Sequence, residues 1–246
     1  MLIPGAAEAA CRLALVLALD VSGSVDEAEY ALQLDGIATA LELPELRDAI
    51  LAFPEAPVAL AVFEWSASSY QRDILGWTEL SGPGDLASVI AHLRGWQREA
   101  APESTGLGAA LLHAGQKLAT GPACWRRVID VSGDGRNNDW PAPRHIRETG
   151  PLAGITVNAL AVGEERPHPN DRDNDHLQDL ADYFEARVIQ GPDAFVETAK
   201  GFDDYARAMA KKLLREISSP PMGRLEMQPT RLADNGERSR PAPRRR

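Results

Sequence analysis

The sequence predicts an α/β protein built on a single doubly wound, Rossmann-like sheet that is mostly parallel, with helices on both faces. Short segments rich in Val, Leu and Ala, typical of strands buried on both faces, alternate along the chain with longer segments of helical character. A link of only four residues, 66–69, joins two strand-like segments and is too short for a crossover. It therefore predicts one antiparallel edge strand. The length of 246 residues suits one large domain or two small ones.

The first expected strand covers residues 12–20, a continuous apolar run that stops at Ser-Gly-Ser. A helix over 26–43 should follow, because its acidic first turn suits the positive end of the helix dipole. Strands over 58–64 and 70–77 form the expected hairpin. The remaining expected elements are helices over 83–96, 107–119, 141–149, 176–186 and 193–217, and strands over 126–131, 155–162 and 187–190.

Charge and composition divide the chain into three parts. Residues 1–10 resemble the remnant of a secretory signal peptide around Ala7-Glu8-Ala9, although a ragged N-terminus is the alternative. Residues 11–218 form the expected domain. Residues 219–246 hold seven Arg and three acidic residues and are expected to be a disordered basic tail. The net charge of −10 thus leaves a strongly acidic body, which argues against nucleic acid as the main partner. No run of about 20 apolar residues exists, so no transmembrane segment is expected.

The motif Asp20-Val-Ser22-Gly-Ser24 follows the first buried strand. Open α/β sheets bind ligands at the carboxyl ends of their strands. Three oxygen-bearing side chains at alternate positions of a tight turn converge there. Carboxylate and hydroxyl oxygens are hard ligands, so the motif predicts a site for Mg²⁺ or Mn²⁺.

This motif resembles the Asp-x-Ser-x-Ser signature of the von Willebrand factor A domain superfamily, in which it forms a metal-ion-dependent adhesion site (MIDAS). The superfamily also expects a Thr before a helix and an Asp after the fourth strand, and Thr105 in STGLGAAL and Asp134 in DVSGDG stand at those places. The segments around Asp134 and at the end of the domain further resemble a bacterial subgroup without an established function.

The resemblance implies roles for these five residues. Ser22, Ser24 and Thr105 would contact the metal, and Asp20 and Asp134 would act directly or through water. A water or a partner's carboxylate would take the remaining position, which the charge of an under-neutralised cation favours. Two alternatives stay open nearby. Asp130 is a structural partner or a further ligand, and residues 137–139 rim the site or only form a turn.

The two cysteines, Cys11 and Cys124, precede Asp20 and Asp134 by nine and ten residues. In the sheet that the resemblance implies, the two strands are neighbours, about 4.8 Å apart, which a disulfide tolerates. A disulfide would place the protein in the periplasm or outside the cell. The alternative is a pair of buried thiols in a cytosolic protein.

The resulting functional expectation is a non-catalytic, divalent-metal-dependent module that captures an Asp or Glu carboxylate of a partner protein. A Mg²⁺-assisted hydrolase using the same pocket and an accessory subunit of a chelatase or ATPase are the alternatives. The sequence identifies neither the partner nor the oligomeric state, and it does not separate Mg²⁺ from Mn²⁺.

Overall fold

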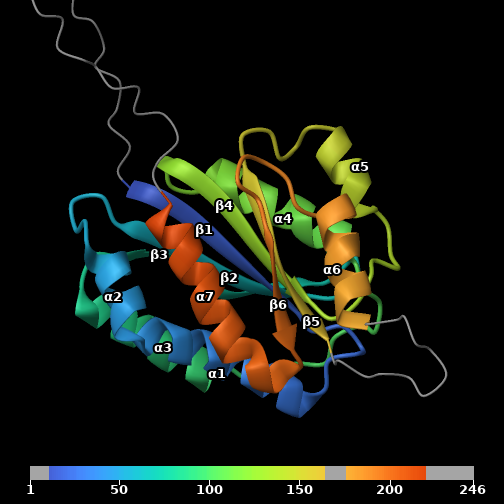
Figure 1. Cartoon of the computed structure of the whole chain (residues 1–246), viewed down its shortest axis with the longest axis horizontal. Helices are drawn as coiled ribbons and strands as arrows, with labels where there is room; N and C mark the ends of the chain where they lie inside the picture. Colours follow the sequence, from blue (N-terminus) through green and yellow to red (C-terminus); the bar gives the residue numbers. More distant parts are fainter. Residues whose placement is uncertain (1–10, 164–175, 220–246) are drawn as a thin grey trace, which may run out of the picture.

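The computed structural model describes residues 11–163 and 176–219, which contain a six-stranded sheet with the order β3-β2-β1-β4-β5-β6 (Figure 1). Among these strands the β2–β3 pair is antiparallel and every other pair is parallel. The predicted parallel sheet with one antiparallel edge strand is therefore confirmed. The strands are β1 (Cys11–Asp20), β2 (Val58–Trp65), β3 (Gln71–Leu80), β4 (Cys124–Gly133), β5 (Thr156–Gly163) and β6 (Val196–Lys200).

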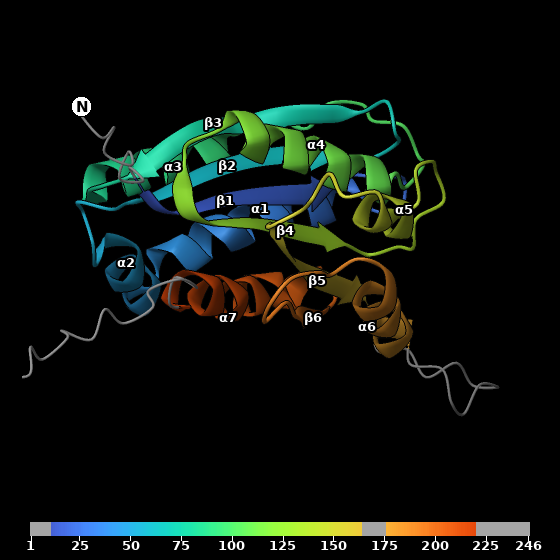
Figure 2. The ribbon, with the colours of Figure 1, turned by 90° about the horizontal axis from the view of Figure 1, so that it is seen from above.

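Seven helices cover the two faces of the sheet in the described part of the chain. One face carries α1, α2, α3 and α7, and the other carries α4, α5 and α6 (Figures 1 and 2). The doubly wound arrangement predicted from the alternation of segments is thereby confirmed. The helices are α1 (Glu27–Glu42), α2 (Pro44–Leu51), α3 (Pro83–Gly95), α4 (Leu107–Thr120), α5 (Pro143–Glu148), α6 (His176–Arg187) and α7 (Tyr205–Ser218).

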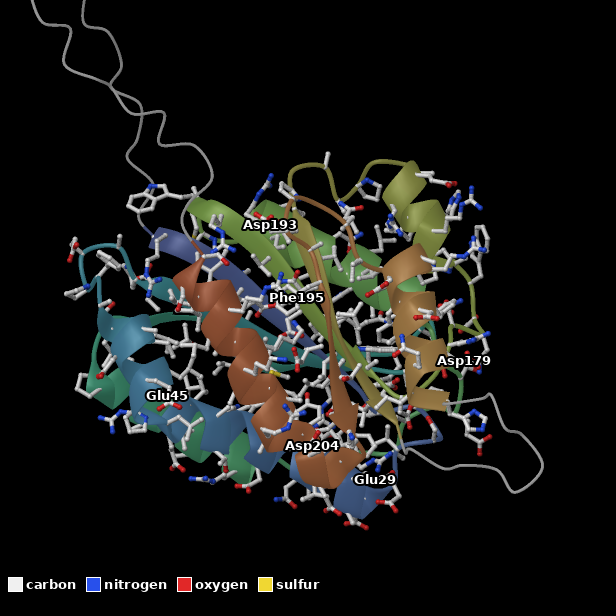
Figure 3. The ribbon with its side chains drawn as sticks, in the orientation of Figure 1. Glu29, Glu45, Asp179, Asp193, Phe195 and Asp204 are labelled. Carbon is white, nitrogen blue, oxygen red and sulfur yellow. A yellow bond between two sulfur atoms is a disulfide. The ribbon has the colours of Figure 1, made fainter. Side chains whose placement is uncertain are left out.

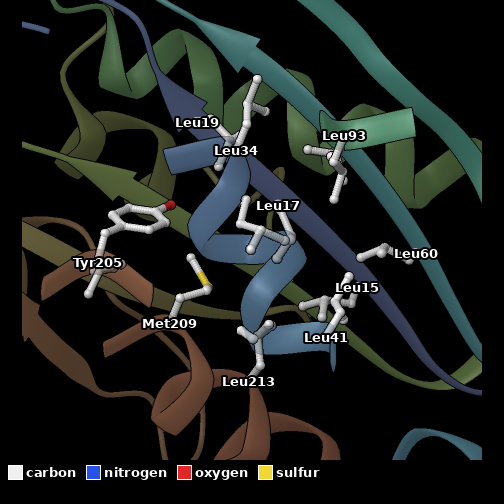
Figure 4. Close-up of a cluster of buried hydrophobic side chains, with 14 of the residues drawn as sticks. Leu15, Leu17, Leu19, Leu34, Leu41, Leu60, Leu93, Tyr205, Met209 and Leu213 are labelled. Carbon is white, nitrogen blue, oxygen red and sulfur yellow. The ribbon is translucent and has the colours of Figure 1, made fainter. Parts of the chain in front are cut away.

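The central strand β1 supplies side chains to both cores, because successive side chains of a strand point to opposite faces. Leu15, Leu17 and Leu19 pack against α1 and α7, where Leu34 and Met209 lie (Figure 4). The alanines and valine between them pack under α4 and α6. Each β1 residue beyond position 12 is buried, which is why the strand has an unbroken apolar sequence rather than an alternating one.

The start of α1 fixes the path by which the chain leaves the turn after β1. Asp26 is the N-cap, and its carboxylate accepts a hydrogen bond of 2.8 Å from the Glu29 backbone N–H. The Glu29 carboxylate in turn accepts one of 2.8 Å from the Asp26 N–H. This reciprocal capping box satisfies two backbone donors and holds the entrance to the helix.

The last strand differs from the prediction. Residues 187–190 do not form a strand, since only Gln190 makes an isolated bridge, to Val157. The strand is instead β6, inside the predicted helix 193–217, and it pairs with β5. Pairing with the open edge of β5 outweighs the helical preference of its Glu, Ala and Lys residues. Gly201, with a φ of 75°, ends β6, and a 3₁₀ turn (Phe202–Asp204) leads into a shortened α7.

Two other helices also depart from the prediction. Helix α2 was not predicted; it begins with Pro44 at its first position, where the missing N–H costs nothing. Helix α5 spans only Pro143–Glu148 of the predicted 141–149, and it also has Pro in its first turn.

The disulfide Cys11–Cys124 is present and joins the first residues of β1 and β4, which lie opposite each other in register. The alternative of two free thiols is therefore wrong in this structure. No helix within the described residues is both long enough and apolar enough to span a bilayer. The expectations for residues 1–10 and for the tail concern segments outside the described residues, apart from Ser219.

Candidate metal centre

Asp20 ends β1 and places a carboxylate in the interior at the carboxyl edge of the sheet, with 1% of the residue exposed. Its Oδ1 accepts a hydrogen bond of 2.8 Å from the Ser22 N–H, which closes the turn. Among the described residues its buried Oδ2 has no hydrogen-bond partner. Burial, and next the nearby charge of Asp134, raise the pKa of Asp20 to about 7.

Three hydroxyl groups gather beside this carboxylate. The Ser22 and Ser24 Oγ atoms are 3.4 Å apart. Thr105, at the loop before α4, donates from Oγ1 to Ser22 Oγ over 3.4 Å. The two long contacts bring the oxygens together without forming strong hydrogen bonds, so they remain available to a shared ion.

Asp134 completes the group from the end of β4. Its Oδ1 accepts a hydrogen bond of 2.7 Å from Ser24 Oγ, and burial raises its pKa despite that bond. Gly133, just before it, leaves room for Asp20, because a Cβ there would lie 3.0 Å from Asp20 Oδ2. All five residues predicted for the site thus meet at one point, although three separate segments supply them.

The turn that bears the two serines is held from three sides. Gln33 of α1 donates to the Asp20 carbonyl over 2.9 Å, and Gly23 donates from its N–H to the Glu103 carbonyl over 3.0 Å. Arg98 donates to the carbonyls of Val21 and Val25, over 3.4 and 2.7 Å. No motif or spacing in the sequence marks Arg98 or Gln33, because their partners are backbone oxygens distant in the chain.

Thr105 is fixed by the loop that follows Asp134. Asn138 accepts a hydrogen bond of 2.7 Å from the Thr105 N–H through its Oδ1, and its own N–H donates to the Thr105 carbonyl over 3.0 Å. Asn137 accepts from the Gly108 N–H over 3.1 Å. Both asparagines therefore join two loops of the centre, which goes beyond the turn-forming role considered from the sequence.

Asp130 lies in the strand, away from these oxygens. Its Oδ1 is 2.7 Å from Lys212 Nζ of α7. Of the two roles considered for Asp130, this ion pair supports a structural one. Asp130 does not join the candidate metal centre.

The oxygen set fits a hard divalent cation. An orphaned buried carboxylate oxygen, a second carboxylate whose charge disfavours the first, and three hydroxyls together match the ligands that Mg²⁺ and Mn²⁺ prefer. Within the described ranges, no group of three or more His, Cys, Asp or Glu side chains could hold a metal. A metal at this edge would therefore depend on Ser22, Ser24 and Thr105 as well as on the acids.

A cavity of about 760 Å³ adjoins Asp134 at the same edge of the sheet. Its wall includes Glu29 of α1 and Asp179 of α6, both labelled in Figure 3. Arg136 and Lys200 also line it, so both signs of charge surround the approach. The candidate centre is thus next to a space in which part of another molecule fits.

Comparison with models of known protein families identifies the family of this chain. A family model described as "Protein of unknown function (DUF1194)" matches residues 10–221. The chain belongs to the DUF1194 family. A search of curated proteins gives no match. Membership therefore assigns the chain to a group of relatives and leaves its activity open.

Solved structures with the same fold include a pilus adhesin and a von Willebrand factor type A protein. The pilus adhesin SpaC of Lactobacillus rhamnosus GG is 12% identical, with a TM-score of 0.58 over 84% of this chain and 31% of its own. A von Willebrand factor type A protein of Catenulispora acidiphila is 16% identical, with a TM-score of 0.55 over 84% and 43%.

A third similar structure is that of proximal thread matrix protein 1 from the mussel byssus, with zinc in its MIDAS motif. It is 16% identical, with a TM-score of 0.55 over 85% of this chain and 46% of its own. The DUF1194 chain therefore spans less than half the length of each of these three proteins. At this low identity the likeness establishes the fold, which is that of the von Willebrand factor A domain.

Proposed function

We propose that this protein is a non-catalytic binding module that holds Mg²⁺ or Mn²⁺ between Asp20, Ser22, Ser24, Thr105 and Asp134 and captures a carboxylate of a partner protein. The observation that carries the proposal is the buried, unpartnered Oδ2 of Asp20 beside a second carboxylate. A buried carboxylate beside a second, half-buried one is unfavourable unless a cation neutralises them. A bound divalent ion supplies that charge.

The donor set also supports capture of a carboxylate. Two carboxylates balance the formal charge of a divalent ion, but the five protein oxygens leave one position of an octahedral coordination sphere open. Ser24 is exposed and Asp134 is half-buried, so the ion would be reachable from solvent. An Asp or Glu side chain of a partner is the simplest hard anion to complete the sphere.

We place the protein outside the cytoplasm, in the periplasm or secreted. The Cys11–Cys124 disulfide supports this location, because disulfides persist in oxidising compartments and are rare in the cytosol. The adhesin among the structures of the same fold is consistent with it.

The experiment is thermal unfolding of EDTA-treated protein, titrated with Mg²⁺, Mn²⁺, Ca²⁺ and Zn²⁺. A metal at 100 times its dissociation constant should stabilise the fold by about 2.7 kcal/mol, which for this size raises Tm by roughly 5–10 °C. Thr105→Val removes one hydroxyl with little change in shape and should weaken the response. Thr120→Val, at the opposite end of α4, is the matched control and should leave it intact.

An unchanged Tm with all four metals would reject the metal centre. A metal response that survives in both Asp20→Ala and Thr105→Val would show that the ion binds elsewhere. Hydrolysis of a phosphate or peptide bond that requires the same five residues would overturn the non-catalytic assignment.

A further inference from the structure

Trp140 is the most exposed large hydrophobic residue in the described part of the chain, with 68% of its surface accessible. It belongs to the loop of residues 136–141, here called the Trp140 loop, which begins two residues after Asp134. Trp is enriched among the residues that contribute most to binding between proteins.

Two side chains of the Trp140 loop, those of Asn137 and Asp139, fasten it to backbone groups. Asp139 accepts from the Trp140 N–H over 2.7 Å through Oδ1, and from the Ser68 N–H over 2.8 Å through Oδ2. Asn137 donates from Nδ2 to the Asp139 carbonyl over 2.5 Å. The indole is therefore presented on a backbone with few free dihedral angles, so little entropy is lost when it is covered.

The same loop is joined rigidly to the candidate metal centre. Asn138 makes two hydrogen bonds with the Thr105 backbone, one through its Oδ1 and one through its own N–H. The loop also packs directly on the first turn of α4, where a Cβ added to Gly108 would lie 2.0 Å from the Pro141 carbonyl oxygen. The position of the Trp140 loop relative to Thr105 is thus set by hydrogen bonds to backbone groups and by close backbone packing.

One neighbouring aromatic ring, that of His145, lies close to the indole of Trp140. His145 of α5 lies with its ring centroid 5.0 Å from that of Trp140, at an angle of 37°. Helix α5 lies beside α4 (Figure 2). Trp140 itself is two residues from Asn138, which bonds to Thr105 of the candidate centre. An acidic residue of a partner would be attracted to a metal at the centre, whereas the indole of Trp140 offers an apolar contact to a different residue of the same partner.

We propose that Trp140 is the apolar half of the partner site: the captured segment is an extended stretch of protein that carries an Asp or Glu for the metal and, at a fixed spacing from it, a proline or aromatic residue that packs on Trp140. This inference rests on the proposed function, since it names the class of partner for that centre. Flat apolar side chains stack on indole with the largest gain in contact area.

The test uses an array of immobilised dodecapeptides. Each contains one Asp at a fixed position, one Tyr or Pro that is moved along all other positions, and Ser or Gly elsewhere; a second set has Asn in place of Asp. Wild-type protein is applied in Mg²⁺ and in EDTA. We expect binding that needs Asp and Mg²⁺ and that is at least fivefold stronger at one or two spacings of the Tyr or Pro.

Trp140→Ala should remove the preference for spacing and weaken the best peptides at least fivefold, while the rise of Tm with metal remains that of the wild type. Trp125→Ala is the matched control, because Trp125 is 49% exposed but lies on β4 near the disulfide, at the opposite end of the strand. It should change neither result.

The outcomes separate the two proposals. No metal response and no Asp-dependent binding would overturn the proposed function together with this inference. A normal metal response combined with no spacing preference, no peptide binding, or equal binding by Trp140→Ala would overturn this inference alone. Self-association in Mg²⁺ that disappears in Trp140→Ala would assign the ring to a second copy of the chain and also overturn it.

Discussion

Two pairs of acids lie in or against the same sheet, in different surroundings. In the interior, Asp130 of β4 and Glu216 of α7 share Lys212, whose Nζ is 2.7 Å from an oxygen of each. At the carboxyl edge, Asp20 and Asp134 face hydroxyl groups. Burial is the main cause that raises the pKa of both Asp20 and Asp130 to about 7, but the charge of Lys212 opposes it only for Asp130.

The difference teaches what an acid pair needs in order to be structural or functional. A pair with a lysine from its own chain has its countercharge within the core, where Asn158 also donates to Glu216 over 2.7 Å, although Asp130 Oδ2 and Glu216 Oε2 have no hydrogen-bond partner among the described residues. No Lys, Arg or His among the described residues is a cause of the pKa shifts of Asp20 or Asp134. In the proposed function, the cation for this second pair comes from solution, and the surrounding hydroxyls suit a metal.

The largest expected effect comes from removing the internal cation. Lys212→Met leaves two buried acids unpaired and should lower the free energy of unfolding by about 3–5 kcal/mol, measured by urea denaturation at pH 7.5. Lys211→Met is the control, because Lys211 is largely exposed and pairs with Glu197 at the surface. A loss below 1 kcal/mol in Lys212→Met would contradict the view that this lysine neutralises the pair.

The disulfide tests whether the response of the metal centre is independent of general stability. The disulfide joins β1 to β4 across a sequence separation of 113 residues, and Cys11→Ser removes this cross-link. Under oxidising conditions the variant should lose about 2–4 kcal/mol of the free energy of unfolding. With dithiothreitol present, the wild type should fall to the level of the variant. The dissociation constant for Mn²⁺, measured by calorimetry, should stay the same, and a change above threefold would mean that the two ends of the strands are coupled.

The same substitution, Asp to Asn, should change the free energy of unfolding in opposite directions in the two acid pairs. In the absence of metal, Asp20→Asn removes a like-charge contact and should raise stability by about 1–2 kcal/mol, while abolishing the rise of Tm with metal. Asp130→Asn instead deprives Lys212 of a partner and should lower stability. Destabilisation by both variants in EDTA would remove the distinction between the pairs.

The smallest effect is expected from the support of the serine turn. Arg98→Leu removes the hydrogen bonds to the Val21 and Val25 carbonyls, so the two serines lose their fixed spacing. Affinity for Mn²⁺ should fall about 3- to 10-fold, less than the roughly 10- to 100-fold typical of groups that bond directly to a metal ligand, because Arg98 contacts only backbone carbonyls of the turn. Arg94→Leu breaks surface ion pairs of α3 with Asp35 and Glu42 and should leave the affinity unchanged, which separates positioning from loss of positive charge.

The elements that the sequence located correctly are those with one dominant signal. An unbroken apolar run predicted β1, and an acidic first turn predicted α1. The wrong element, 187–190, and the missed β6 have weak signals of either kind. Their state depends on which segment reaches the edge of β5, and that is a contact between residues about 37 apart in the chain.

The five oxygen-bearing residues of the candidate centre could be selected from the sequence because their motifs combine distinctive residue types with fixed spacing. The residues that hold them could not. Arg98, Gln33 and Asn138 act on backbone groups of other loops, and neither spacing nor composition marks such partners. The same holds for Lys212, which the sequence shows only as one charge within a helix.

By itself, the sequence determined the alternation of strands and helices, the two-sided burial of β1, and the residue types assembled at the carboxyl edge, since hydrophobic pattern and local ligand chemistry are properties of short segments. Only the tertiary structure decided which acid pair receives a lysine, where the last strand lies, and that Trp140 is held exposed beside Thr105. Each of these is a contact between segments distant in the chain, and the free energy of such a contact depends on the packing that brings the segments together.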